Sequence, residues 1–289
     1  MKIAVASGKG GTGKTTTSIN LALSINDEYP IQLLDCDVEE PNTFLFMNPT
    51  ITNEEKITVK IPHIVEEKCS LCGLCGEICS FNAIAVLKDM VMVFPELCHS
   101  CGACAYLCPE NAILEREREI GILSHGFSEE VECIQGKINT GEALVPPVIR
   151  AVKKYLSDGK VSILDSPPGT SCAVVTTLLG SDFCLLITEP TPFGLHDLDL
   201  AVNLAEKLEI PAGVVINRWD ISDNSSIIEN YCRSKKIPIL LKIPYDRKTA
   251  ELYSQGIPLV KADPRWKKSF KNLFHSIKEM IYRAGTPGN

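Results

Sequence analysis

The sequence of 289 residues contains no uninterrupted apolar run of 18 residues, although 45% of its residues are hydrophobic. A transmembrane helix needs about 20 apolar residues, so no membrane span is expected. Acidic residues outnumber basic ones, and the net charge of −7 argues against a basic surface for nucleic acid. The N-terminus carries no secretory signal, because Lys2–Ala6 leads directly into a glycine-rich loop. These absences predict a cytoplasmic globular protein without a nucleic-acid partner.

Histidine pairs with the spacing of metal ligands are also lacking among the five histidines. Cysteine, in contrast, is abundant, and eight of the 13 cysteines form two quartets of the pattern C-x2-C-x2-C-x3-C. The second quartet repeats the first after 29 residues, and Asn82-Ala83-Ile84 recurs as Asn111-Ala112-Ile113. The two quartets are Cys69, Cys72, Cys75 and Cys79, then Cys98, Cys101, Cys104 and Cys108.

This repeat resembles the bacterial two-cluster ferredoxins, in which the distal cysteine of each quartet ligates the other cluster. Three close cysteines reach three irons of a cubane, and the fourth ligand comes from elsewhere. Gly73, Gly76 and Gly102 suit loops that wrap such a cluster. His99 lies inside the second quartet, where it either tunes a cluster or has no role. The repeat predicts two 4Fe-4S clusters, one held by Cys69, Cys72, Cys75 and Cys108, the other by Cys98, Cys101, Cys104 and Cys79.

A zinc site and a set of disulfides are the alternatives for these cysteines. Zinc ribbons use pairs of C-x2-4-C separated by a longer gap, and disulfides are rare in the cytosol. Both alternatives are therefore disfavoured. Outside the repeat, Cys36 and Cys184 fall in apolar strand-like runs and are expected to be buried, inert thiols.

A second motif lies near the N-terminus, where Gly8–Thr15 reads GKGGTGKT and matches G-x4-G-K-[ST]. It follows an apolar strand and precedes a helical pattern, which is the context of a phosphate-binding loop. Lys14 is expected to reach the β- and γ-phosphates, and Thr15 to place its hydroxyl on Mg²⁺. The predicted nucleotide-binding residues of this loop are Gly10, Gly11, Thr12, Gly13, Lys14, Thr15 and Thr16.

Lys9 makes the loop resemble the deviant Walker A loop of the MinD/ParA/nitrogenase iron protein group. The resemblance implies an ATP-dependent homodimer in which Lys9 contacts the nucleotide of the other subunit. There it would neutralise charge on the transferred phosphoryl group. The alternative is a solvated loop lysine.

Two strand ends resemble the switch segments of the same group. Leu34-Asp35-Cys36-Asp37 resembles switch I, which implies that Asp37 orders the attacking water. Asp35 could be a strand-end carboxylate with no catalytic part. Asp165-Ser166-Pro167-Pro168-Gly169 resembles the Walker B and switch II pattern D-x-P-x-G. This likeness implies that Asp165 holds Mg²⁺ through water and that Gly169 meets the γ-phosphate. The implied catalytic set is Lys9, Lys14 and Asp37.

Later segments resemble the base-binding part of the site. Asn217 follows an apolar strand at a position where relatives have an asparagine that recognises adenine. The segment Ile243-Pro244-Tyr245-Asp246 resembles the group's I-P-x-D, and so Pro244, Tyr245 and Asp246 are expected to wall the base.

Strands and helices alternate along the chain once the cysteine stretch is set aside. This pattern predicts an α/β fold with a mostly parallel P-loop sheet, helices on both faces, and a small inserted ferredoxin-like α+β domain. The expected nucleotide domain is formed by 1–60 and 116–289, and the insert by 61–115. The insert follows directly on switch I, the segment that responds to a γ-phosphate in such proteins.

An amphipathic helix is predicted over residues 264–283. Apolar side chains at helical spacing usually pack a terminal helix onto the core, and we favour this arrangement. The alternative, suggested by MinD, is a helix that binds a membrane surface through its lysines.

The whole chain resembles MinD-superfamily ATPases with an inserted ferredoxin domain, which implies slow ATP hydrolysis stimulated by a partner. The function favoured is an ATP-gated electron carrier with a redox or metallocluster-protein partner. A second possibility is an ATPase for metallocluster assembly, although eight ligands favour permanent clusters. A third is a positioning ATPase with structural or redox-sensing clusters. Amide-forming ligase chemistry is disfavoured, because the chain has no room for a glutaminase domain.

Overall fold

The computed structural model describes residues 1–221 and 226–285. The strands are β1 (Lys2–Ala6), β2 (Ile31–Asp35), β3 (Thr50–Ile64), β4 (Ile84–Val86), β5 (Val91–Val93), β6 (Ile113–Ser128), β7 (Val131–Ile138), β8 (Val161–Asp165), β9 (Phe183–Thr188), β10 (Ala212–Asn217) and β11 (Ile239–Ile243). The helices are α1 (Lys14–Ile25), α2 (Thr43–Met47), α3 (Leu74–Glu77), α4 (Ala103–Tyr106), α5 (Val145–Lys153), α6 (Cys172–Leu178), α7 (Pro192–Lys207), α8 (Ser226–Lys235), α9 (Arg247–Ser254), α10 (Leu259–Ala262) and α11 (Pro264–Gly285), with 3-10 turns at Glu66–Lys68 and Pro95–Leu97.

Within these ranges a nine-stranded sheet runs in the order β11-β10-β9-β1-β8-β2-β7-β6-β3. All pairs from β11 to β7 are parallel, whereas β7–β6 and β6–β3 are antiparallel. In a parallel sheet the carboxyl ends of the strands share one edge, where ligands of open α/β sheets bind. The segments that follow β1, β2, β8 and β10 therefore meet at this edge.

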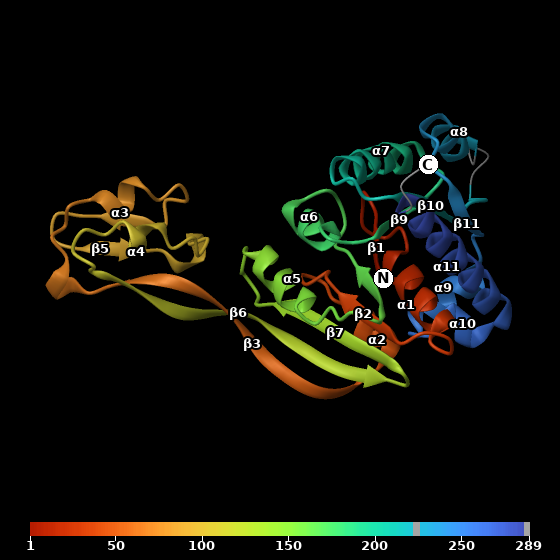
Figure 1. The fold of residues 1–289 in the computed structure, drawn as a ribbon, viewed down its shortest axis with the longest axis horizontal. Helices are drawn as coiled ribbons and strands as arrows, with labels where there is room; N and C mark the ends of the chain where they lie inside the picture. The colour runs from red at the N-terminus through yellow and green to blue at the C-terminus, as the bar shows by residue number, and fades with distance from the viewer. Residues whose placement is uncertain (222–225, 286–289) are drawn as a thin grey trace.

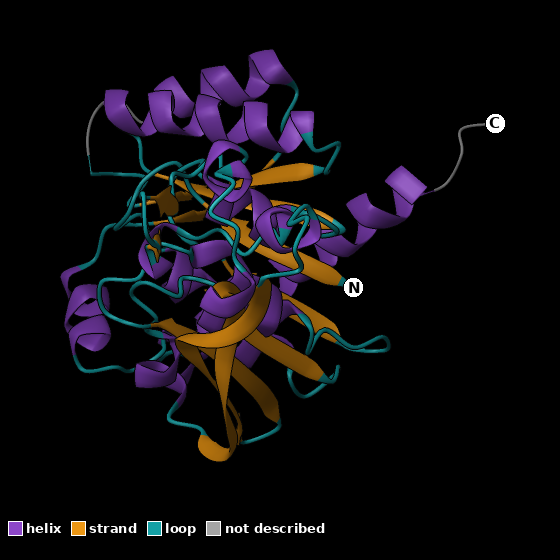
Figure 2. Cartoon of the chain, turned by 90° about the vertical axis from the view of Figure 1, so that its left-hand side faces the viewer, coloured by secondary structure: helices purple, strands orange, loops and turns teal. Residues whose placement is uncertain are grey.

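Helices cover both faces of the sheet (Figures 1 and 2). Because side chains alternate along a strand, Ile3 and Val5 of β1 face the layer of α1 and α11, whereas Ala4 and Ala6 face α6, α7 and α8. A third apolar cluster joins α5 to β2, β7 and the β3–β6 pair. The fold class predicted from the sequence is confirmed by this arrangement.

Strands β3 and β6 continue beyond the sheet as a two-stranded ribbon. β7 pairs with β6 only over Gly121–Ser128, whereas β3 stays paired with β6 as far as Ile64 and Ile113. About eight residues of each strand thus form a ribbon roughly 25 Å long at the usual rise per residue. The predicted boundaries at 60/61 and 115/116 both lie inside these continuous strands.

The ribbon carries the cysteine repeat, here called the cysteine module (residues 65–112), away from the main sheet (Figure 1). The module contains α3, α4 and the antiparallel β4–β5 pair. Its two halves repeat each other in backbone as well as in sequence. Leu71 and Ser100, 29 residues apart, are both left-handed, with φ of 54° and 56°, and the following Gly73 and Gly102 have φ of 86° and 72°.

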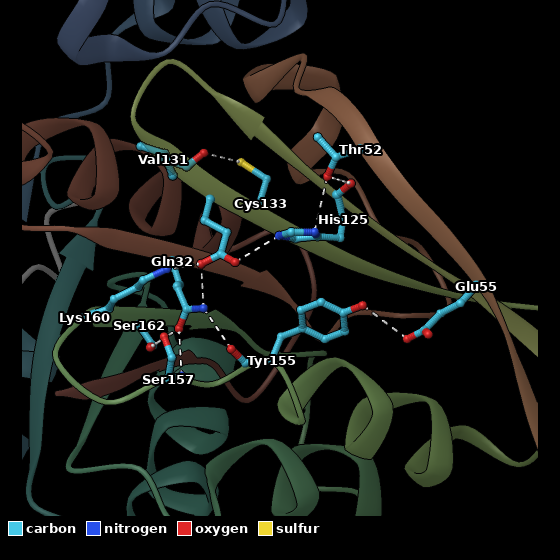
Figure 3. A network of polar contacts seen from close by, with 11 residues as sticks. Gln32, Thr52, Glu55, His125, Val131, Cys133, Tyr155, Ser157, Lys160 and Ser162 are labelled. Atoms are coloured by element: carbon cyan, nitrogen blue, oxygen red, sulfur yellow. Dashed lines mark hydrogen bonds and ion pairs between the residues drawn. The ribbon is translucent and has the colours of Figure 1, made fainter.

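A polar network fixes β3 and β6 to the main sheet before they continue as the ribbon (Figure 3). Glu132 on β7 accepts hydrogen bonds from Gln32 Nε2 at 2.7 Å and Lys160 Nζ at 2.8 Å, and it contacts His125 Nε2 of β6 at 2.9 Å. Tyr155, just after α5, donates its hydroxyl to Glu55 of β3 at 3.3 Å. Strands β3 and β6 are therefore held at their base before they leave the sheet.

The C-terminal helix α11 packs on the core, as favoured from the sequence. Phe270, Leu273, Phe274 and Ile277 are buried in the cluster shared with α1. Among the described residues, no helix has the length and apolar character needed to span a bilayer.

Candidate functional site

The glycine-rich loop between β1 and α1 has a backbone that only glycine accommodates at Gly13. This residue has φ of 100°, and a Cβ on it would lie 2.5 Å from Asn217 Nδ2. The same amide nitrogen donates to Thr12 O at 2.7 Å. Asn217, at the end of β10, therefore braces the loop, and α1 starts at Lys14 with its N-terminus facing the loop.

Asp165, fully buried at the end of β8, lies beneath this loop. Its Oδ2 accepts a hydrogen bond from Thr15 Oγ1 at 2.6 Å and its Oδ1 one from Ser18 Oγ at 2.8 Å. Burial raises the pKa of Asp165. Burial also lowers the pKa of Lys14, an effect opposed by the nearby charges of Asp165 and Asp37. The structure thus brings together a lysine, a hydroxyl and an acid, the combination that binds phosphates with a divalent cation.

Asp35 is the last residue of β2 and Asp37 lies two residues later, and the two side chains have different surroundings. Asp35 is completely buried and accepts backbone hydrogen bonds from Asp37, Asn42 and Thr43 at 3.0 to 3.1 Å. Burial and the neighbouring Asp165 raise the pKa of Asp35. Asp37 lines the cleft, and burial followed by Asp165 raises its pKa to about 6. Asp35 therefore shapes the loop, and Asp37 is the one of these two carboxylates that lines the cleft.

The segment after β8 lies directly beside the glycine-rich loop. Gly169 donates its N–H to Ser7 O at 2.9 Å and has φ of 90°, in the left-handed region. Ser7 Oγ donates to Lys9 O at 2.6 Å. Ser7 thus connects Gly169, in the segment after β8, to Lys9 in the glycine-rich loop through two hydrogen bonds.

A cleft of about 400 Å³ extends from the glycine-rich loop to α9 and α10. Its volume is in the range of small-ligand sites. Asp246 caps α9 by accepting the N–H of Lys248 at 3.1 Å, and Asp220 accepts the N–H of Tyr245 at 2.6 Å. From the predicted set, the cleft is lined by Gly10, Gly11, Gly13, Lys14, Thr15, Thr16, Asp37, Asn217, Pro244, Tyr245 and Asp246.

Sequence reasoning missed Glu189, which follows β9 at the same edge of the sheet. Glu189 Oε2 lies 3.5 Å from Lys9 Nζ, and its Oε1 accepts a hydrogen bond from Arg218 at 2.5 Å. Lys9 is therefore paired inside its own subunit and is not simply solvated. The position of Glu189 after an apolar strand was the available signal, since Asp37, Asp165 and Asn217 share it.

The cysteine module contains two separate cavities, and each is lined by three cysteines of one quartet and the last cysteine of the other. This is the exchange that the ferredoxin pattern predicts. The first cavity is lined by Cys69, Cys72, Cys75 and Cys108, and the second by Cys79, Cys98, Cys101 and Cys104.

Backbone groups around these cavities point at sulfur. The N–H groups of Ala83 and Ala112 lie 3.3 Å from Cys79 Sγ and Cys108 Sγ. Such contacts favour thiolates and orient ligands. In the described part of the chain, no three His, Cys, Asp or Glu side chains have the spacing for a single metal ion. The donor set of eight sulfurs around two cavities fits two iron–sulfur clusters.

Comparison with known proteins bears on the nucleotide half of the site. The family described as the CobQ/CobB/MinD/ParA nucleotide binding domain matches residues 3–259, which is most of the chain. The chain belongs to this family. It is a MinD/ParA-type P-loop protein with a nucleotide-binding domain, and its glycine-rich loop is the P-loop of that domain.

Two relatives show how far the similarity in sequence extends along the chain. An uncharacterized protein of Methanocaldococcus jannaschii is 34% identical over 90% of this chain and 92% of its own length. A protein of Pyrococcus horikoshii named iron-sulfur cluster carrier protein is 28% identical, over 90% of this chain and 79% of its own length. Among solved structures, the septum site-determining protein MinD from Pyrococcus horikoshii, complexed with Mg-ADP, superimposes with a TM-score of 0.59. It is 21% identical and covers 98% of this chain and 97% of its own, which supports the shared fold.

Proposed function

We propose that this protein binds and hydrolyses ATP, and that nucleotide-driven closure of a homodimer is coupled to electron transfer through two 4Fe-4S clusters. The observation that carries the proposal is a pair of four-cysteine cavities at the end of a ribbon that continues from the edge strands of the sheet that carries the nucleotide cleft. A redox or metallocluster protein would be the partner, in the cytoplasm and without nucleic acid or membrane.

In the nucleotide half, each residue has a distinct task. Lys14 would bind the β- and γ-phosphates, and Thr15 would leave Asp165 to join the Mg²⁺ shell, with Asp165 acting through water. Mg²⁺ would supply charge neutralisation at the phosphates. Asp37 would orient the attacking water from the cleft wall. Asn217 and the segment Pro244–Asp246 would receive the base. Thr15 is bonded to Asp165, and Asn217 to the loop, before nucleotide binds. We therefore expect slow hydrolysis that a partner stimulates.

In the cysteine module, Cys69, Cys72, Cys75 and Cys108 would hold one cluster, and Cys98, Cys101, Cys104 and Cys79 the other. The clusters would supply one-electron chemistry, at a potential that hydrogen bonds and solvent exposure adjust. The N–H groups aimed at Cys79 and Cys108 are suited to stabilise the thiolates. Burial raises the pKa of the Cys75 and Cys104 thiols, so that metal binding must displace their protons.

A continuous path supports coupling between the two halves. Asp35 holds the N–H groups of Asn42 and Thr43, and α2 begins at Thr43. The backbone oxygen of Met47, at the end of α2, accepts a hydrogen bond from Ser128 of β6, and β3 begins three residues later at Thr50. A shift of the segment containing Asp37 would therefore reach the start of β3 and the end of β6, the two strands that continue as the ribbon.

Cluster delivery is the second candidate, because several relatives are named iron-sulfur cluster carrier protein. The enclosed arrangement of four cysteines per cavity favours clusters that stay bound. The positioning role finds less support, because α11 is packed on the core through Phe270 and Phe274.

A transfer assay separates the two candidates. The anaerobically reconstituted protein would be mixed with an apo-ferredoxin acceptor, with or without Mg-ATP, and the iron content of both would be followed. We expect the iron to stay with this protein in every nucleotide state. Transfer of iron that ATP accelerates would assign the protein to cluster delivery.

A further inference from the structure

Glu189 binds two cations at once. Its side chain is 12% exposed, and its two oxygens contact Lys9 Nζ at 3.5 Å and Arg218 at 2.5 Å. Lys9 is the more weakly held of the two by distance, and its side chain is 35% exposed, compared with 43% for Arg218. The carboxylate can therefore release Lys9 and still keep a partner.

The backbone around this pair is fixed, so that only side chains need to move. Ser7 Oγ holds the carbonyl of Lys9 at 2.6 Å. Arg218 has φ of 53° and donates its N–H to Asn217 Oδ1 at 3.0 Å, while Asn217 Nδ2 donates to Thr12 O. Both Asn217 and Arg218 line the nucleotide cleft. The Lys9 side chain is the part of this assembly that can swing outward.

We propose that Glu189 is a positioning residue that holds Lys9 within its own subunit until the dimer closes. This inference rests on the proposed role of Lys9 across a homodimer interface. On closure, Lys9 leaves Glu189 for the phosphates of the second subunit. Arg218 then remains on Glu189, and this contact avoids leaving a mostly buried carboxylate without a partner.

Substitutions of Glu189 and of Arg218 should have opposite effects on dimerisation. Glu189→Gln removes the charge that holds Lys9, so dimerisation becomes tighter. Arg218→Gln leaves Lys9 as the sole cation on Glu189, so its release costs more and dimerisation becomes weaker. A general loss of stability would weaken dimerisation in both variants and could not produce opposite signs.

The experiment is sedimentation equilibrium of the full-length, reconstituted protein with saturating non-hydrolysable Mg-ATP analogue, after occupancy is verified for each variant. A partly exposed ion pair corresponds to about a 2- to 5-fold effect. Since two pairs open for each dimer, Glu189→Gln should tighten dimerisation by about 4- to 25-fold. Glu229→Gln, which breaks an ion pair with Lys242 away from the cleft, is the matched control and should not alter dimerisation.

Two results would overturn the inference: unchanged dimerisation in Glu189→Gln, or weaker dimerisation in both Glu189→Gln and Arg218→Gln. The second result would instead indicate either a general loss of stability or a contact of Glu189 in the closed interface, and thermal unfolding of both variants would separate these two causes. A failure of the proposed function would be seen in the unmodified protein rather than in the Glu189 and Arg218 variants. The unmodified protein would then show no analogue-dependent dimer, or one that Lys9→Ala leaves intact.

Discussion

Thr15 Oγ1 donates a 2.6 Å hydrogen bond to Asp165 Oδ2, which joins the first turn of α1 to the end of β8. In the proposed function, Thr15 and Asp165 would hold Mg²⁺, the hydroxyl directly and the carboxylate through water. Asp165→Asn keeps the size of the side chain but removes its charge. We expect this variant to lose about 10- to 100-fold in Mg²⁺-dependent nucleotide affinity.

The measurement for Asp165 is nucleotide affinity by calorimetry with and without Mg²⁺. Nucleotide affinity should depend on Mg²⁺ in the unmodified protein and hardly at all in Asp165→Asn. An equal Mg²⁺ dependence in both proteins would contradict the assigned role.

Asp37 should give ATP hydrolysis an acidic limb. Its pKa is raised to about 6, chiefly by burial and then by Asp165. Only the ionised carboxylate can accept a hydrogen bond from water in the orientation needed for attack, so kcat/KM should rise as pH increases through about 6. Asp37→Asn should bind ATP but hydrolyse it about 10²- to 10⁴-fold more slowly. A pH profile that is flat between about pH 5 and pH 8 in the unmodified protein would argue against this assignment.

Asp35 should matter for stability, in contrast to Asp37. In Asp35→Asn one carboxylate oxygen is replaced by an N–H₂ group, which cannot accept a hydrogen bond. At least one of the backbone N–H groups of Asp37, Asn42 and Thr43 then loses its acceptor. Leaving buried donors unpaired costs about 1–3 kcal/mol each, and we expect a lower free energy of unfolding and looser nucleotide binding. Thermal unfolding of the reconstituted protein would measure this loss. Asp27→Asn, which alters an exposed ion pair with Lys271, should unfold almost like the unmodified protein.

The exchange of cysteines between the two clusters can be tested with paired serine variants. If Cys108 belongs with Cys69, then Cys69→Ser combined with Cys108→Ser should damage one cluster and spare about half of the iron. Cys69→Ser combined with Cys79→Ser should damage both clusters. Iron analysis and EPR of the reconstituted variants distinguish the cases. The reverse outcome would mean that each quartet holds its own cluster.

The sequence predicted those features that depend on local spacing. The P-loop, the strand ends carrying Asp37 and Asp165, and each cysteine quartet are short segments of the chain, in which residue type and spacing leave few alternatives. The ribbon could not be predicted in the same way. Its apolar residues, such as Val59 and Ile61, alternate as in any strand, and their continuation past β7 depends on long-range pairing with β6. Glu189 was missed for a similar reason, because its contacts with Lys9 and Arg218 arise only when distant loops meet at one edge of the sheet.

The central claim is that the nucleotide state changes the environment of the clusters. The most direct measurement is an anaerobic redox titration monitored by EPR, without nucleotide, with Mg-ADP, and with a non-hydrolysable Mg-ATP analogue. Lys14→Ala serves as the control, since it should lose nucleotide binding while keeping its iron. We predict two cubane signals whose midpoint potential shifts with the ATP analogue in the unmodified protein and not in Lys14→Ala. Midpoints that are the same in all three nucleotide states would contradict the coupling.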